Sequence, residues 1–321
     1  MQISLADIEA AAAIVYAEMA PTPALNWPLL SERLGTQVWV KHENHTPVGA
    51  FKIRGGLVYF ADLIAGGESV QGVISATRGN HGQSVGYAAR HYGIPATIVV
   101  PKGNSTEKNA AMQAQGVTLI EYGEDFQAAR EYAIQLADER GLLMVPSMHP
   151  LLVAGVATYS LELFQAVPDI DVVYVPIGLG SGICGMIAAR DALGLSTEVV
   201  GVVSAHATAY ADSFNAGQLL ESPVSTLLAD GMACRTPDPL ALEVILASVD
   251  HIVAVTDAEV AAAMGVLFEC THNVCEGAGA AAVAAAMQER AANIGRRVAV
   301  VASGGNVDRS VFAEILARPS Q

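Results

Sequence analysis

Short, continuous apolar runs recur along the chain, and longer segments with helically spaced apolar positions separate them. In the first half this pattern predicts strands at 70–75, 97–100 and 117–122, alternating with helices at 82–92, 105–115 and 126–140. Strands that alternate with helices of this length are joined by right-handed crossovers. The first half is therefore predicted to form a parallel sheet covered by helices.

The second half of the chain repeats this scheme. Its apolar runs predict buried strands at 172–176, 199–204, 252–255 and 298–302. Unbroken apolar character is typical of strands whose sheet is covered on both faces. We therefore predict an α/β fold of two open parallel-sheet α/β domains that face each other. A ligand is expected in the cleft at the carboxyl ends of the strands.

Three more segments have a clear pattern. Alanines and spaced aliphatic residues predict a helix over 6–20, which Pro21 and Pro23 end. A short strand is predicted at 37–41, and an alanine-rich segment at 278–287 is predicted to be a tightly packed core helix.

Composition limits the class of protein. The chain has 321 residues, of which 52% are hydrophobic and 15% charged, and we expect a homo-oligomer that covers part of this apolar surface. The formal net charge of −15 argues against nucleic acid or an anionic membrane as partner.

The first nine residues show no secretory signal, and four cysteines form no disulfide framework, so the cytoplasm is the expected location. The uncharged run 172–189 contains Pro176 and several glycines, which predicts a buried strand, turn and helix rather than a membrane span.

Lys52 is the strongest candidate for chemistry. It lies between Phe51 and Ile53, just before Gly55 and Gly56, so it is predicted at a glycine-rich turn with apolar neighbours. Burial lowers the pKa of a lysine and frees its amine to form a Schiff base or to accept a proton. The alternative is an ordinary lysine that buries its aliphatic stem and keeps its amine in water.

A glycine loop follows the predicted strand 172–176. Gly178, Gly180 and Gly182 can turn backbone N–H groups inward at the start of a helix, which makes a phosphate site without a basic side chain. The alternative is a dinucleotide fingerprint. That motif needs an acidic residue after the next strand, and this chain has Ser204 there.

Two further motifs also lie at predicted strand ends. One is the segment 75–83, with Asn80 and His81 on the turn between a strand and a helix, and the other is 303–306, which begins at Ser303. A short amide at such a turn can bind a hydroxyl group of a ligand. The alternative for Asn80 is a helix N-cap.

In this order, the four motifs resemble those of the serine/threonine dehydratase family, which includes the threonine ammonia-lyases. These are pyridoxal phosphate enzymes of fold type II, with an architecture like that of tryptophan synthase β, and the resemblance runs from about Ile14 to about Asp308. It implies a large cofactor-binding domain of residues 1–49 and 151–321. It also implies a small domain of residues 50–150 that carries the lysine and asparagine loops, with the active site in the cleft between them.

The resemblance also assigns roles to individual residues. Lys52 would bind pyridoxal 5'-phosphate covalently and act as the catalytic base. The residues implied in cofactor binding are Lys52, Phe51, Asn80, Gly178, Leu179, Gly180, Ser181, Gly182, Glu276 and Ser303. The residues implied in substrate binding are Ser75, Thr77, Arg78, Gly79, Asn80 and His81. Ser303 would face the pyridine nitrogen, and an uncharged hydroxyl there makes the ring a weaker electron sink, which favours elimination over transamination.

Two departures from the family narrow the function. Arg78 stands where racemases of the family carry a second proton-transferring serine, and an arginine stays protonated. Arg78 is predicted either to bind a second anionic or polar group of the substrate or to form a structural ion pair. The family's divalent-metal positions carry Ser204, Thr208 and Tyr210 in this chain, although Asp212 is close. The prediction is therefore no activating Mg²⁺, or at best a different site of the monovalent type. A metal site at Cys270, His272 and Cys275 is also not predicted, because the spacing fits no zinc pattern.

The predicted function is pyridoxal-phosphate-dependent α,β-elimination of a β-hydroxy-α-amino acid, giving a 2-oxo acid and ammonia. Threonine and serine are the default substrates, and Arg78 keeps a β-aryl serine and 3-hydroxyaspartate open. An amino-acid racemase is the alternative within the family, and a nucleotide-dependent oxidoreductase or an amino-acid-binding protein is the alternative outside it. Only 15 residues follow Asn306, so no appended regulatory domain is expected.

Overall fold

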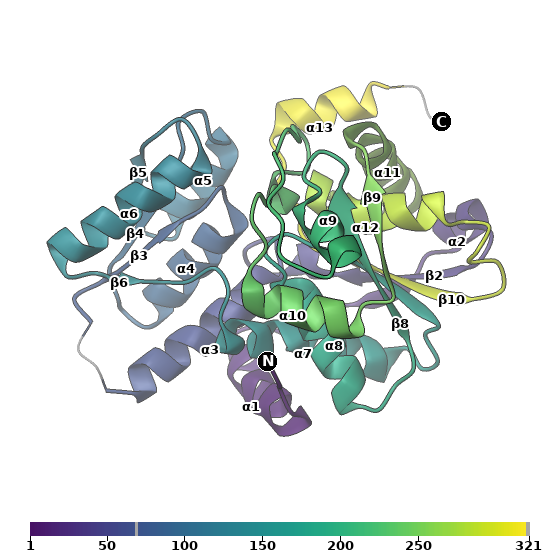
Figure 1. Cartoon of the computed structure of the whole chain (residues 1–321), viewed down its shortest axis with the longest axis horizontal. Helices are drawn as coiled ribbons and strands as arrows, with labels where there is room; N and C mark the ends of the chain where they lie inside the picture. The colour runs from purple at the N-terminus through teal and green to yellow at the C-terminus, as the bar shows by residue number, and fades with distance from the viewer. Residues whose placement is uncertain (68–69, 319–321) are drawn as a thin grey trace.

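Two separate β-sheets organise the chain (Figure 1). The computed structural model describes residues 1–67 and 70–318. The six-stranded sheet has the order β1-β2-β10-β7-β8-β9, and the four-stranded sheet has the order β5-β4-β3-β6. The strands are β1 Ala24–Asn26, β2 Gln37–His42, β3 Val73–Ala76, β4 Ala96–Val100, β5 Thr118–Glu121, β6 Leu143–Met144, β7 Val172–Pro176, β8 Glu198–Ser204, β9 His251–Val255 and β10 Arg297–Ala302.

Helices connect these strands and cover both sheets. They are α1 Leu5–Tyr16, α2 Pro28–Leu34, α3 Lys52–Ala65, α4 Asn80–His91, α5 Thr106–Ala114, α6 Phe126–Arg140, α7 Pro150–Ala166, α8 Ser181–Ala192, α9 Ala209–Ala216, α10 Pro239–Ser248, α11 Asp257–Thr271, α12 Gly277–Gln288 and α13 Arg309–Leu316, with 3₁₀ turns η1 Glu43–His45 and η2 Asp230–Met232. The α/β class predicted from the sequence is confirmed.

The six-stranded sheet is buried on both faces. Along β7, Val172 and Tyr174 pack with α11 and α12 on one face, whereas Val173 and Val175 pack with α7 and α8 on the other. Successive side chains of a strand point to opposite faces, so both sets must be apolar. This explains why the strand appears in the sequence as a continuous apolar run.

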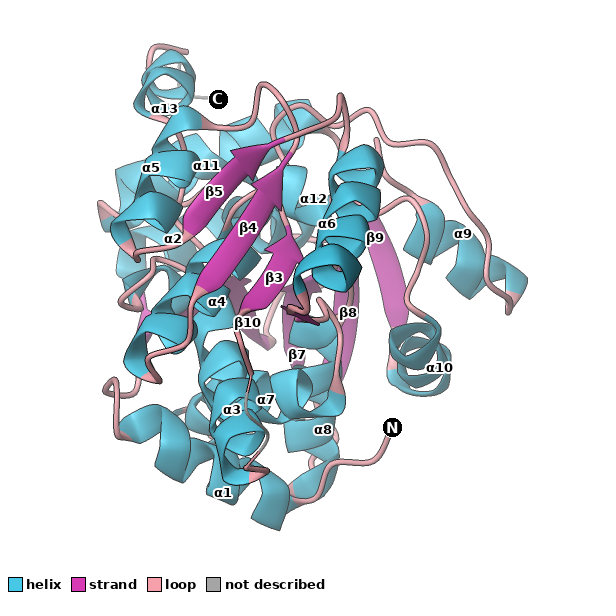
Figure 2. Cartoon of the chain, turned by 90° about the vertical axis from the view of Figure 1, so that its left-hand side faces the viewer, coloured by secondary structure: helices cyan, strands magenta, loops and turns pink. Residues whose placement is uncertain are grey.

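The four-stranded sheet is built in the same way from a nearer part of the chain. Val73 and Ile98 pack with α4 and α5 on one face, and Ile74 packs with α6 on the other. Figure 2 shows α6 in front of the strands β3 and β4. All of its strand pairs are parallel. In Figure 1 this sheet lies to the left of the six-stranded one.

Helix α3 lies between these two parts (Figure 1). Its residues Ile53 and Leu57 share a buried cluster with α1 and α7, and it also contacts α4 of the four-stranded part. The strands of the small sheet all fall within the small domain predicted at 50–150. The exact limits of the two domains stay a prediction.

Some predicted elements differ from the structure. The six-stranded sheet is mixed rather than purely parallel, because β1 pairs antiparallel with β2. Strands β1 and β6 were not predicted, since elements of three and two residues are too short to show a period. Helix α1 ends at Tyr16, four residues before the predicted end. Among the described residues, no helix has both the length and the apolar character needed to cross a membrane.

The fold gathers the sequence motifs at the carboxyl ends of strands. The segment 77–80 follows β3, the glycine loop 178–182 follows β7, and Ser303 follows β10. Lys52 follows β2 in the chain, after the 3₁₀ turn η1. Parallel strands within each sheet end at the same edge, so one side of each sheet supplies these loops.

Candidate active site

Lys52 is the first residue of α3 rather than part of a turn, which corrects the sequence prediction. The glycines at 55 and 56 lie inside this helix, where the backbone of Leu152 and the hydroxyl of Ser84, respectively, leave no room for a side chain. A Cβ at Gly55 would lie 2.6 Å from the carbonyl oxygen of Leu152. The hydroxyl of Ser84 in α4 donates to the Lys52 carbonyl at 2.6 Å, which ties the start of α3 to the four-stranded part.

Among the described residues, the hydrogen-bond and ring contacts of the Lys52 amine are with neutral groups. Its Nζ donates to Oγ of Ser181 at 2.9 Å and lies 5.0 Å from the centre of the Phe51 ring. Burial lowers the pKa of Lys52 to about 8, because the charged form is poorly solvated there. The predicted environment of a reactive lysine is therefore present.

The other lysines of the chain face carboxylates. There are four lysines in the sequence: Lys41, Lys52, Lys102 and Lys108. Lys41 pairs with Glu162, Lys102 with Glu124, and Lys108 with Asp230. A neighbouring carboxylate favours the protonated form of a lysine, which is not nucleophilic. Burial lowers the pKa of Lys41 overall, although Glu43 and Glu162 oppose this shift. Lys52 is thus the lysine best suited to covalent chemistry.

The glycine loop 178–182 approaches Lys52 from the six-stranded sheet. Gly180 has φ +103°, and a Cβ there would lie 2.5 Å from Cβ of Ala241. A Cβ at Gly178 would lie 2.4 Å from the carbonyl oxygen of Gly231, so both positions require glycine. Helix α8 then begins at Ser181, and no side chain caps its first N–H groups. Such a helix start attracts an anion.

The loop is also held from behind by Tyr210. The Tyr210 hydroxyl donates to the Leu179 carbonyl at 2.9 Å and accepts from the backbone N–H of Asp238 at 3.0 Å. Tyr210 is 1% exposed. These two hydrogen bonds of Tyr210 hold the glycine loop in place without a charged side chain.

Asn80 begins α4 and is not its N-cap, because Gly79 occupies that position. Its amide donates to Oε1 of Glu276 at 2.5 Å, and its carbonyl oxygen accepts from Asn306 at 2.8 Å. Two of the predicted motifs, 75–83 and 303–306, therefore meet at the Asn80 side chain, together with Glu276. Burial raises the pKa of Glu276, although the charge of Lys108 opposes this shift.

Lys108 links the two sheets at this point, a role that the sequence did not predict. It lies on α5, and its Nζ is 2.8 Å from Asp230 and 3.1 Å from Glu276, both on the six-stranded side. Its stem covers Gly79, where a Cβ would lie 2.6 Å from Cδ of Lys108. Only the three-dimensional structure brings these distant residues together.

The residues predicted to bind substrate differ in their hydrogen-bond partners. Ser75 is buried in β3, where its hydroxyl donates to the Val145 carbonyl at 3.2 Å. The Thr77 hydroxyl accepts from the N–H of Gly79 at 3.1 Å. Burial, with a contribution from Lys52, lowers the pKa of His81 to about 3, and its Nε2 atom is buried without a hydrogen-bond partner in the described structure.

Arg78 has a partly exposed side chain. Its carbonyl accepts from Asn104 at 3.1 Å, but its guanidinium forms no ion pair within residues 1–67 and 70–318. Of the two roles predicted for it, a structural ion pair has no support here.

Phe51, the residue before Lys52, is hydrogen-bonded to Ser303. The N–H of Phe51 donates to the Ser303 carbonyl at 3.1 Å, and the Phe51 ring packs edge-to-face on Tyr159. The Ser303 hydroxyl donates to the Ala278 carbonyl at 3.4 Å, a long hydrogen bond that a closer acceptor can replace. The structure thus brings Phe51, Ser303, Ser181 and Lys52 together.

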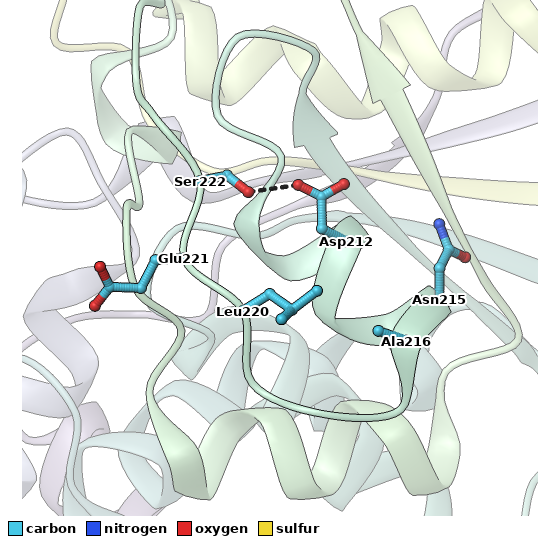
Figure 3. A pocket seen from close by; sticks show the side chains of 6 residues that line it. All are labelled: Asp212, Asn215, Ala216, Leu220, Glu221 and Ser222. Atoms are coloured by element: carbon cyan, nitrogen blue, oxygen red, sulfur yellow. Dashed lines mark hydrogen bonds between the residues drawn. The ribbon is translucent and has the colours of Figure 1, made fainter.

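The residues discussed for a metal have other partners. The Ser204 hydroxyl accepts from the N–H of His206, and the Thr208 hydroxyl donates to Asp212. Ser222 also donates to Asp212 (Figure 3). The surface pocket in Figure 3 contains none of the predicted site residues. Across the described part of the chain, no group of three or more His, Cys, Asp or Glu residues is placed to hold a metal ion.

Comparison with known proteins identifies similar chains. The family model for "Pyridoxal-phosphate dependent enzyme" matches residues 15–304. An L-threonine ammonia-lyase of Thermotoga maritima is 35% identical over 98% of this chain and 78% of its own length. An L-threo-3-hydroxyaspartate ammonia-lyase of Saccharomyces cerevisiae is 31% identical over 92% of this chain and 90% of its own length. The structure of maize serine racemase is similar with a TM-score of 0.91 and 27% identity, covering 98% of this chain and 97% of that one.

Proposed function

The chain belongs to the pyridoxal-phosphate dependent enzyme family, and from this premise we propose that it eliminates water from a β-hydroxy-α-amino acid, giving a 2-oxo acid and ammonia. The observation that carries the proposal is the half-buried Lys52, whose amine has a lowered pKa and donates to the neutral Ser181 hydroxyl of the glycine loop. The names of the relatives from Thermotoga maritima and Saccharomyces cerevisiae support an ammonia-lyase.

The residues of this chain fit the cofactor. Lys52 supplies a nucleophilic amine, and the uncapped start of α8 supplies N–H donors for a phosphate group. The tight approaches at Gly178 and Gly180 exclude side chains at these two positions of the loop. The unpaired, buried Nε2 of His81 is a polar atom that a ligand would satisfy.

We assign the cofactor contacts on this basis. Lys52 would bind the cofactor covalently, residues 178–182 would bind its phosphate, and Phe51 would pack against its ring. Asn80 would bind its ring hydroxyl, with Glu276 near the ring edge, and Ser303 would face its pyridine nitrogen. When bound, pyridoxal phosphate supplies an electron sink for the electrons left at the substrate Cα.

Lys52 is also the proposed base. With a pKa of about 8, roughly a tenth of its amine is neutral at pH 7, far more than for an ordinary lysine of pKa about 10.4. A neutral amine in the site can accept the Cα proton of the substrate. The N–H groups of the 77–81 segment, at the start of α4, would hold the substrate carboxylate.

Arg78 is the proposed selector of the substrate. It stays protonated, and it has no carboxylate partner among the described residues. A guanidinium can bind a carboxylate through paired hydrogen bonds. This supports 3-hydroxyaspartate as a substrate beside threonine and serine.

A substrate panel tests the proposed function. Both enantiomers of serine, threonine, 3-hydroxyaspartate and a β-aryl serine are incubated with the holoenzyme, and 2-oxo acid and ammonia are measured. We expect stoichiometric release of both products from at least one β-hydroxy amino acid. Release from none of them would contradict the proposal.

The Arg78→Ser variant tests substrate selection on the same panel. Losing a charge-assisted contact of about 1.5–3 kcal/mol is expected to lower kcat/KM for 3-hydroxyaspartate by about 10- to 150-fold, with serine changed much less. Arg90→Ser is the control, since Arg90 lies on the exposed end of α4. Equal losses for both substrates would show that Arg78 does not select between them.

Racemisation is a second candidate, favoured by the similarity to maize serine racemase. It needs a second group that moves a proton on the face of the substrate opposite Lys52. A protonated arginine is a poor base, so Arg78 opposes this reaction. The panel separates the two activities, because a racemase converts one enantiomer into the other without releasing ammonia.

A further inference from the structure

The hydroxyl of Ser181 occupies an unusual position in the site. It accepts a hydrogen bond from Nζ of Lys52 at 2.9 Å and belongs to the first residue of α8, between Gly180 and Gly182. Ser181 is 2% exposed, so bulk water does not compete for this contact. The hydroxyl is therefore a fixed neighbour of the reacting amine.

The hydrogen of this hydroxyl is not used by the protein. Gly180, and not Ser181, is the N-cap of α8, and within the described residues the Ser181 side chain donates to no acceptor. The positive end of a helix dipole stabilises negative charge on an atom beside it. Ser181 can thus accept a hydrogen from Lys52 and donate its own to another atom.

Elimination of water creates a need for such a group. Hydroxide is a poor leaving group, so the β-oxygen must receive a proton as its bond to Cβ breaks. His81 is the other titratable group near Lys52, but its pKa of about 3 leaves it neutral at pH 7 without an acidic proton to give. Phe51, whose ring centre lies 5.0 Å from Nζ, has no side-chain hydrogen to donate.

We propose that Ser181 is a further catalytic residue that carries a proton from Lys52 to the departing β-hydroxyl. This inference rests on the proposed function. Lys52 takes the Cα proton and becomes an ammonium, and the electron pair of the Cα–H bond forms the Cα–Cβ double bond as the Cβ–O bond breaks. Ser181 gives its hydrogen to the leaving oxygen, which departs as water. Ser181 then receives a hydrogen from the Lys52 ammonium, so both side chains return to their starting states.

The Ser181→Ala variant tests this step with two leaving groups. The substrates are the best β-hydroxy amino acid of the panel and its β-chloro counterpart, because chloride leaves without a proton. We expect kcat to fall by about 10²- to 10⁴-fold for the hydroxy substrate and by less than about threefold for the chloro substrate. Ser181→Thr, which restores a hydroxyl, is expected to recover most of the lost rate.

The outcomes separate the relay from the proposed function. Equal losses for both substrates, or no loss for the hydroxy substrate, would overturn the relay. If the wild-type enzyme eliminated neither leaving group, the proposed function itself would fail.

A second readout needs no cofactor and no turnover. The rate at which fluorodinitrobenzene labels Lys52 in the cofactor-free protein is followed against pH by mass spectrometry. The wild-type midpoint is expected near the Lys52 pKa of about 8. Ser181→Ala should lower this midpoint, because the ammonium loses a hydrogen-bond acceptor. An unchanged midpoint would show that the two groups do not interact.

Discussion

Replacement of Lys52 by alanine is expected to abolish both turnover and covalent attachment of pyridoxal phosphate. The variant loses the amine that forms the Schiff base and the base that takes the Cα proton, so product formation should fall by at least about 10⁴-fold. The visible absorbance band of the bound cofactor should disappear as well. Ammonia release and the absorbance spectrum of the purified protein are the measurements.

Lys102→Ala is the matched control. The Lys102 side chain is 62% exposed and pairs with Glu124 at the surface. Its replacement should leave the absorbance band and the rate unchanged. If Lys52→Ala retained either property at the wild-type level, the assignment of Lys52 would be wrong.

Replacement of Arg54 by methionine is expected to give the largest loss of stability. Arg54 is fully buried two residues after Lys52, and it binds Glu43 at 2.7 Å and Glu162 at 2.6 Å. Lys41 also binds Glu162, so two cations balance two anions inside the protein. Removing one cation leaves a buried charge without compensation, which costs about 3–5 kcal/mol of unfolding free energy.

Urea unfolding measures this loss, and Arg296→Met is the control. Arg296 pairs with Glu198 at 2.6 Å, but its side chain is 29% exposed, so its replacement should cost less than about 1 kcal/mol. A loss below about 1 kcal/mol for Arg54→Met would contradict the importance of the buried network.

The pH dependence of stability provides a second test of this network. Burial raises the pKa of Glu162, but Arg54 and Lys41 outweigh it and lower the pKa overall. A lowered folded-state pKa gives stability that is present above the unfolded-state pKa of about 4.3 and is lost as the pH falls through the folded value. In Arg54→Met this acid-dependent contribution should shrink.

The fold class could be predicted from the sequence because the strands are buried on both faces. Apolar runs such as 298–302 stand out, and the loops after them can be placed at one edge of a sheet. Lys52, Ser303 and the glycine loop were therefore predicted as neighbours, and they do lie together. The helical start at Lys52 was not predicted, since Gly55 and Gly56 favour a turn in the absence of their packing partners.

Contacts between distant charged residues could not be predicted. Lys41, Glu43 and Arg54 lie in a polar stretch that resembles a protein surface, yet all three are 0% exposed. Lys108 lies on α5, and its pairing with Asp230 depends on how the two sheets face each other. Such contacts depend on tertiary structure and leave no local pattern. The homo-oligomer and the cytoplasmic location stay predictions.

The most direct test of the account is to find which lysine carries the cofactor. The purified protein is incubated with pyridoxal phosphate, reduced with borohydride, digested and analysed by mass spectrometry. With four lysines in the chain, every candidate can be resolved. The account predicts one phosphopyridoxyl group per chain, on Lys52. A group on Lys41, Lys102 or Lys108 with Lys52 unmodified, or no modification at all, would contradict it.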